Sequence, residues 1–318
     1  MPTRRTVLGV AAASLASTLL PRRPLVAGER SLSVDFTFAD LLVRHIRGDS
    51  QRAALLEHPA LAAVVRHRQM SGQIQADGPM VLDRLIDSTG EVDGAVRVLD
   101  AWRGREQELI ALGSAAADLL PVGTSLAGTA FFELGYDIGV AAPPDVLLNA
   151  AHPHFLDDPS EVAFYFVHEL HHVGFLEHRP VPLMGRLREP GFLLELITYM
   201  TQLEGMAVHA AHAPRQAAGR LEADEDYRVY DDPAEAERIV GEYRRVRQDA
   251  VALGDRRPED AELGSVLTSM SSGSRLWYRF GALVARAIEQ RDGGQALVRT
   301  VVEPGPWLAE AERQLEGS

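Results

Sequence analysis

The sequence predicts an α+β fold that is predominantly helical and contains one small sheet. Between 36 and 120, apolar residues recur at spacings of three and four between Gly, Pro and Asp breaks, which is typical of amphipathic helices. Between 121 and 151 the residue pattern changes to short apolar runs bounded by Gly and Pro, which indicate strands. Helical periodicity then resumes in five segments: 159–178, 192–211, 233–252, 275–291 and 306–316. We therefore expect a small sheet beside the helix at 159–178.

The first 27 residues have the layout of an export signal. Arg4 and Arg5 directly precede an uncharged run of apolar and small residues from Val7 to Leu20, and a short segment then ends at Ala27. This arrangement predicts a twin-arginine-type signal peptide at 1–27 and a location outside the cytoplasm. The apolar run is too short to span a bilayer comfortably, so we expect no stable membrane anchor. The alternative is the basic N-terminus of a cytoplasmic protein.

Residues 28–318 are predicted to form a single domain, with a helical N-terminal part (28–120) and a second part (121–318) that carries the chemistry. In the second part, "GTAFFELGY" (128–136) and "DVLLNAA" (145–151) are the expected strands, and "GVAAPP" divides them.

The composition excludes several kinds of site and several classes of partner. The chain has 318 residues and no cysteine, which excludes disulfides, thiolate metal sites and cysteine nucleophiles. Its formal net charge is −13, and removal of 1–27 takes away four arginines and no acid, which leaves −17. Such an acidic surface argues against nucleic acid and anionic membranes as partners.

The segment 159–178 reads as a buried helix. Asp158 is placed to be the N-cap, Pro159 occupies the first helical position, and Glu161 can complete a capping box. Apolar residues fall on every side of this segment, which is typical of a core helix.

Within this helix, His168, Glu169 and His172 form a His-Glu-x-x-His motif. Histidines four residues apart are about 40° apart around a helix axis, so both rings can reach one ion. Glu169 is offset by about 100°, beside the metal, where it can act as the general base that takes a proton from water. Imidazole and carboxylate ligands favour zinc.

Two residues compete to be the third protein ligand. His178 has the spacing of the third histidine of metzincins, but Phe175 stands where that motif turns sharply at a glycine. Glu204, in the segment 191–212, lies on the apolar face of its helix, where a lone carboxylate needs a partner such as zinc. Gly205 beside it is small enough to let this helix approach the zinc helix. We favour Glu204, with His178 as the alternative.

In these motifs the chain resembles the gluzincin-type metallopeptidases. "VHELHHVGF" followed some thirty residues later by "EGMA" carries the resemblance, and in detail it is similar to a bacterial family of exported zinc-dependent peptidases. The resemblance implies a zincin-like core, zinc bound by His168, His172 and Glu204, and Glu169 as general base. It covers most of residues 28–318. Val208 stands where an aspartate often orients a histidine ligand in gluzincins, so that orientation must come from elsewhere.

A hydrolytic site also needs a hydrogen-bond donor to the substrate oxygen that becomes negative in the transition state. Arg275 and Tyr278 lie near the start of a predicted helix, and we take Tyr278 as the candidate; His209 is a weaker one. The function predicted from the sequence is an exported zinc-dependent hydrolase, with a peptide or protein as substrate. The alternatives are a non-catalytic, zinc-stabilised binding protein and a zinc hydrolase of a non-peptide amide.

Overall fold

The computed structural model describes residues 31–73, 75–254 and 256–317, so the predicted signal peptide lies outside the described residues. The strands are β1 (Leu32–Asp35), β2 (Gly128–Glu133), β3 (Gly139–Ala142) and β4 (Asp145–Asn149). The helices are α1 (Thr37–Ile46), α2 (Arg52–Glu57), α3 (Pro59–Met70), α4 (Gly78–Ser88), α5 (Val92–Trp102), α6 (Glu106–Asp118), α7 (Pro153–Asp157), α8 (Glu161–His178), α9 (Phe192–Ala217), α10 (Pro233–Ala252), α11 (Asp260–Ser271), α12 (Leu276–Asp292), α13 (Gly294–Arg299) and α14 (Gly305–Glu316). Three short 3₁₀ helices are η1 (Met184–Arg186), η2 (Leu221–Ala223) and η3 (Glu225–Tyr230).

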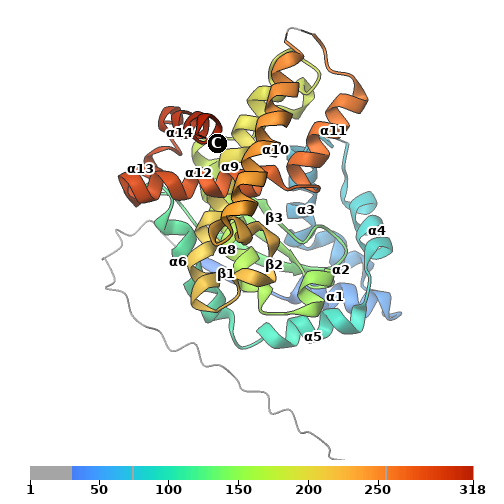
Figure 1. The fold of residues 1–318 in the computed structure, drawn as a ribbon. Coiled ribbons are helices and arrows are strands. Elements are labelled where there is room, and N and C mark those ends of the chain that lie inside the picture. The colour runs from blue at the N-terminus through green and yellow to red at the C-terminus, as the bar shows by residue number, and fades with distance from the viewer. Residues whose placement is uncertain (1–30, 74, 255, 318) are drawn as a thin grey trace, which may run out of the picture.

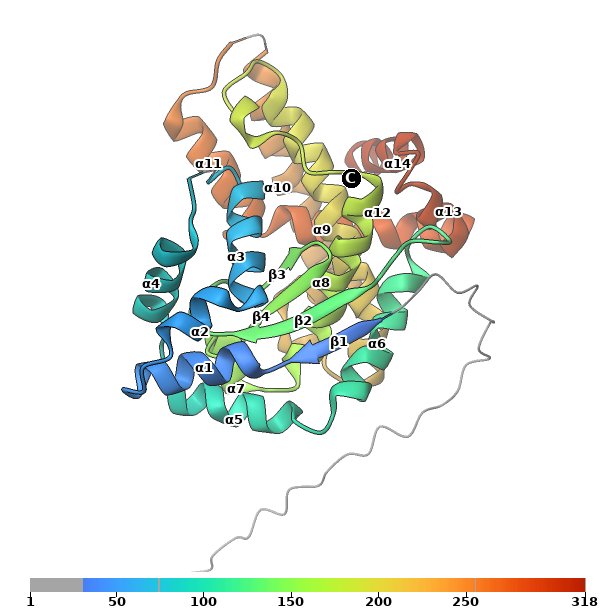
Figure 2. The ribbon, with the colours of Figure 1, turned by 180° about the vertical axis from the view of Figure 1, so that it is seen from behind.

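The fold is α+β and predominantly helical, which confirms the predicted fold class. One four-stranded mixed sheet has the order β1-β2-β4-β3 (Figures 1 and 2). β1, β2 and β4 are parallel, and β3 pairs antiparallel with β4 at one edge. Helix α8 packs against β3 and β4, while α1 and α3 contact the sheet from the N-terminal part of the chain. The sheet therefore lies beside the helix that carries the His-Glu-x-x-His motif.

The sequence pattern did not predict two of the strands. β1 lies directly before the first predicted helix, and β3 occupies most of "GVAAPP", which we had assigned as a divider. Both have only four residues, too few for a clear alternating pattern, and both are defined by the strands that they pair with. The small residues of β3 allow α8 to pack close to the sheet edge.

The helices α8, α9 and α12 pack together in the core of the second part of the chain. Figure 1 shows α9 between α8 and α12, and α9 contacts both. Gly205 of α9 meets Gly281 of α12 and not α8: a Cβ built on Gly205 would lie 2.2 Å from the backbone carbon of Gly281. Our expectation that Gly205 brings α9 close to α8 is therefore wrong. No described helix is both long and apolar enough to cross a bilayer.

We predict that Gly205→Ala destabilises the protein. The new methyl group would overlap backbone atoms of α12, and backbone cannot rotate away as a side chain can. Overpacking of this kind typically costs about 1–3 kcal/mol of unfolding free energy. Chemical denaturation measures the change. The matched control is Gly241→Ala in α10, where nothing lies within 4 Å of the added Cβ. This control should be neutral or more stable by up to about 1 kcal/mol. Equal stability of the two variants would contradict the close crossing of α9 and α12.

Candidate metal centre

The helix α8 begins later than the sequence pattern predicts. Its first residue is Glu161, and Asp158 caps the preceding turn: its Oδ1 accepts from the backbone N–H of Ser160 at 2.9 Å. Glu161 makes no capping box. Its buried carboxylate lies 2.5 Å from Nη2 of Arg215, which is also buried. A charge-assisted ion pair in the interior thus replaces the predicted surface cap, because a buried guanidinium needs an anionic partner.

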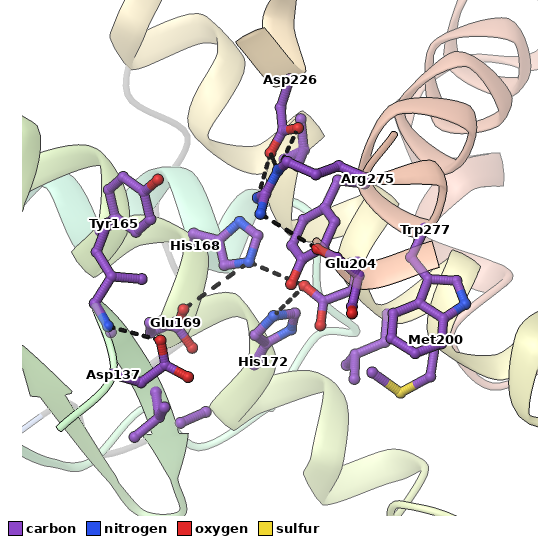
Figure 3. A pocket seen from close by; sticks show the side chains of 18 of the residues that line it. Asp137, Tyr165, His168, Glu169, His172, Met200, Glu204, Asp226, Arg275 and Trp277 are labelled. Atoms are coloured by element: carbon purple, nitrogen blue, oxygen red, sulfur yellow. Dashed lines mark hydrogen bonds and ion pairs between the residues drawn. The ribbon is translucent and has the colours of Figure 1, made fainter. Parts of the chain in front are cut away.

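The two motif histidines and Glu204 come together between α8 and α9. Nε2 of His168 lies 3.2 Å from Oε2 of Glu204, and Nε2 of His172 lies 3.0 Å from the same oxygen. Figure 3 shows both rings pointing toward this carboxylate. Glu204 and His172 are buried, and 12% of the His168 side chain is exposed. One donor atom from each residue lies within 4.8 Å of the others. Two imidazoles and a carboxylate at this spacing fit a single zinc ion.

The electrostatics of this cluster are those of tightly coupled buried groups. Burial opposes ionisation of Glu204, yet the neighbouring histidines hold the pKa of its carboxyl well below its usual range. Burial likewise opposes charge on His172, but the carboxylates of Glu204 and Glu169 raise its pKa. For His168, burial and the charge of His172 lower the pKa to about 4. Glu204 is therefore an anion that requires a positive partner, which a metal cation can supply.

Glu169 lies beside this cluster. Its Oε1 is 4.0 Å from Nε2 of His168, and neither carboxylate oxygen is part of the three-residue donor group. Burial raises the pKa of Glu169 to about 8. The side chain fits against the sheet edge because residue 139 is glycine: a Cβ there would lie 3.1 Å from Cγ of Glu169. Such a carboxyl group, buried and next to the cluster, has the properties of a general base.

His178 lies away from the cluster. Helix α8 continues without a turn through Phe175, and Nε2 of His178 lies 2.7 Å from Oγ1 of Thr124. The geometry thus gathers Glu204, and not His178, with the motif histidines. His171, also in α8, is fully buried, and neither of its ring nitrogens has a hydrogen bond of ordinary geometry among the described residues.

Tyr278 at the start of α12 shares the cavity with the cluster. Its ring is 6.0 Å from the His168 ring and nearly parallel to it. Burial, followed by the charge of Glu204, raises the pKa of Tyr278 well above its usual value, so the phenol stays protonated. Arg275 places its guanidinium carbon 3.9 Å above the Tyr278 ring and is held by Asp226 (Figure 3). His209 is engaged elsewhere, with Tyr230 and Glu289.

A cavity of about 700 Å³ opens onto these residues. Its walls include residues of α3, the segment before β3, β3 itself, α7, α8, η1, α9, η3, α11 and α12. The sequence reading missed several of the polar groups in it: His67, Asp137, His152, His154, Arg215, Asp224 and Asp226. They have no motif spacing to the motif histidines or to Glu204, so no local signal marked them. The Nδ1 atom of His172 is buried without a hydrogen-bond partner among the described residues, and Val208 offers none.

A second group of metal-type side chains lies at one end of the cavity. His154, Glu161 and Asp224 each have a donor atom within 4.8 Å of the others. Arg215 occupies this group: its Nη2 lies 2.5 Å from Glu161 and 3.3 Å from Asp224. One guanidinium already pairs with both carboxylates, so the group is an ion-pair network that joins α8, α9 and the residue that precedes η3.

Comparison with known proteins gives one match. Residues 109–308 match a family model described as "Putative zinc dependent peptidase (DUF5700)". The matched span includes all of α8, α9 and α12, and it begins after α1–α5. No curated protein and no solved structure matches the chain.

Proposed function

Since this chain belongs to the family described as "Putative zinc dependent peptidase (DUF5700)", we propose that it is an exported zinc peptidase of the gluzincin type. The observation that supports this most is the group of His168, His172 and Glu204 with Glu169 beside it, at the wall of a large cavity. We assign the first three as zinc ligands. When bound, zinc supplies Lewis acidity, which acidifies water and polarises a substrate carbonyl group.

The protein residues then have separate tasks. Glu169 accepts a proton from the attacking water and returns it to the leaving amine, since its carboxyl group faces the cavity and is no ligand in our assignment. A cation held beside it would favour the ionised carboxylate and so lower the pKa of Glu169 from about 8. The Tyr278 hydroxyl, protonated at neutral pH, donates a hydrogen bond to the oxygen that becomes negative. Arg275 packs against the Tyr278 ring and is itself held by Asp226.

The edge strand of the sheet supports a peptide as the substrate. Strand β3 lies at the sheet edge and lines the cavity beside Glu169, and no strand among the described residues pairs with its outer side. An extended peptide could pair with such an edge.

The function is tested by incubating the purified protein with a mixed peptide library at neutral pH and identifying products by mass spectrometry. We expect cleavage that a chelator abolishes and added zinc restores. A protein that holds zinc but cleaves no peptide would instead be a binding protein or a hydrolase of another amide.

Tyr278→Phe should lower kcat by about 10² without loss of zinc. Removal of one oxyanion donor typically has an effect of this size, and the phenylalanine keeps the ring contacts with His168 and Arg275. Steady-state kinetics with a cleaved peptide measures the change. The matched control is Tyr243→Phe in α10, whose hydroxyl contacts Thr201 away from the cavity. If kcat of Tyr278→Phe equals that of wild type, another group stabilises the oxyanion.

We propose further that the chain is exported by the twin-arginine route. Replacement of Arg4 and Arg5 by lysine keeps the charge but removes the guanidinium pair, so precursor should accumulate in the cytoplasm. Cell fractionation and immunoblotting of precursor and mature forms measure this. The matched control replaces Arg22 and Arg23 by lysine and should be exported normally. Unchanged export of the Arg4/Arg5 variant would indicate another route.

A further inference from the structure

Helix α3 forms a wall of the cavity although it lies outside the matched span 109–308. His67, Met70 and Ser71 line the cavity, and their spacing of three and four residues places them on one face of the helix end. Neither the zinc motif nor the family match assigns a role to this face.

The ring of His67 is fixed from one side. Its Nδ1 lies 2.7 Å from the hydroxyl oxygen of Tyr136, and the two rings meet edge to face. Tyr136 is itself held in the segment between β2 and β3: its N–H donates to Glu133, and its carbonyl accepts from the side chain of Asn149. The guanidinium of Arg68 covers the face of the Tyr136 ring. This fixed hydroxyl therefore sets the orientation of the His67 ring.

The same contact sets which nitrogen carries the proton. Burial lowers the pKa of His67 to about 4 and raises the pKa of Tyr136 to about 12, so at neutral pH the imidazole is neutral and the phenol is protonated. We assign the phenol O–H as the donor to Nδ1 of His67, because the phenol has no other acceptor among the described residues. The remaining nitrogen, Nε2, then carries the hydrogen.

This Nε2–H is an unused donor. No described residue makes a hydrogen bond with Nε2 of His67, and this atom is not among the described buried atoms that lack a partner. The atom is therefore not fully buried, and the residue that carries it lines the cavity. The zinc cluster is close enough that the charge of His172 influences the ionisation of His67.

The surrounding charges select the acceptor. Asp137, Glu169 and Glu204 line the same cavity, and Asp137 lies near Glu169 in Figure 3. Arg215 and Arg275 also line the cavity, but they are paired with the carboxylates of Glu161, Asp224 and Asp226, so the three other carboxylates disfavour an anionic ligand. A neutral donor in an acidic cavity suits a neutral acceptor, such as the carbonyl oxygen of a peptide bond.

We propose that His67 is a substrate-binding residue whose Nε2–H donates a hydrogen bond to a backbone carbonyl of a peptide lying beside the zinc cluster. Tyr136 is the positioning residue that orients its ring, and Met70 extends the same wall with an apolar contact. The helical N-terminal part thus completes a substrate site whose zinc ligands lie in the second part. This inference rests on the proposed function, because it requires a peptide at the zinc cluster.

The test compares two zinc-directed probes, a peptide hydroxamate and acetohydroxamate, by titration calorimetry on the zinc-loaded protein. His67→Ala should weaken binding of the peptide hydroxamate about tenfold, the value of one good hydrogen bond, and leave acetohydroxamate binding and zinc content unchanged. His67→Gln keeps an N–H donor and should recover part of the affinity. Tyr136→Phe should weaken the peptide probe less than His67→Ala. The matched control, His45→Ala on α1, removes a half-buried histidine outside the cavity and should change neither probe.

Other outcomes decide against the proposal. Equal affinity of wild type and His67→Ala for the peptide hydroxamate overturns it, as does an equal loss for both probes, which would mean that His67 acts through the metal site or the fold. Wild type that binds no peptide hydroxamate also overturns it. If wild type binds the peptide probe but cleaves no peptide, the peptidase function fails, while the comparison of the two probes still decides the role of His67.

Discussion

Replacing His168 or His172 with alanine is expected to remove stoichiometric zinc from the protein. Each histidine supplies one of the three protein donors, and the third donor is Oε2 of Glu204, which lies 3.2 Å and 3.0 Å from the two Nε2 atoms. The two donors that remain after the substitution cannot hold zinc in a three-ligand site. Loss of a residue that merely orients a ligand typically costs 10–100-fold in affinity, so loss of a ligand should exceed about 10². Hydrolysis should disappear with the metal. Elemental analysis of dialysed protein measures the zinc content, and a competition titration with a chromophoric chelator measures the zinc affinity.

The same experiment separates the two candidates for the third ligand. Glu204→Ala should lose zinc as the histidine variants do, and Glu204→Gln should lose less affinity because the amide oxygen remains a weak donor. His178→Ala is the matched control on α8: its ring contacts Thr124 outside the cluster, so zinc should be retained. If His178→Ala strips the metal and Glu204→Ala does not, the assignment of the third ligand is wrong. Retention of zinc by both His168→Ala and His172→Ala would exclude the site altogether.

The second large effect is expected at Glu169. Glu169→Gln should keep zinc and nearly normal stability but lower kcat by about 10²–10⁴, the usual contribution of general acid–base catalysis. The amide has the size of the carboxyl group and cannot accept the proton. Kinetics, zinc content and chemical denaturation on the same preparation measure the three quantities.

Glu177→Gln is the matched control for Glu169→Gln. It makes the same change on the same helix, where the side chain contacts the backbone of Ser125 outside the cavity, so kcat should be unchanged. Loss of zinc from Glu169→Gln, to the extent seen for the histidine variants, would make Glu169 a ligand and contradict the proposed proton transfer.

The parts of the site that lie on long helices could be predicted from the sequence. α8 and α9 have strong periodicity, and a carboxylate on the apolar face of a helix marks a residue with a buried partner. Glu204 is buried beside the motif histidines, as that argument requires, and its role as ligand stays a prediction until metal is measured. The division into a signal peptide and a single domain also stays a prediction.

The remaining features depend on packing between distant segments, which local patterns do not encode. Glu161 has the spacing of a capping residue, but Arg215, 54 positions further along the chain, recruits its carboxylate into the core. Gly205 is recognisable as a close-contact residue, yet the sequence does not say that its partner is Gly281. His67 comes from a helix a hundred positions before the zinc motif, and only the tertiary structure brings it to the cavity.

The central claim is that zinc is held by two histidines and a glutamate at the wall of a peptide-binding cavity. It is tested most directly by a crystal structure of the zinc-loaded protein with a peptide hydroxamate, with anomalous diffraction data collected at the zinc edge. We predict one anomalous peak within coordination distance of His168, His172 and Glu204, with the hydroxamate on the same ion and Glu169 beside it but not bound to it. A peak bound to His178, a peak at His154 and Asp224, or no peak at the α8–α9 cluster would contradict this account.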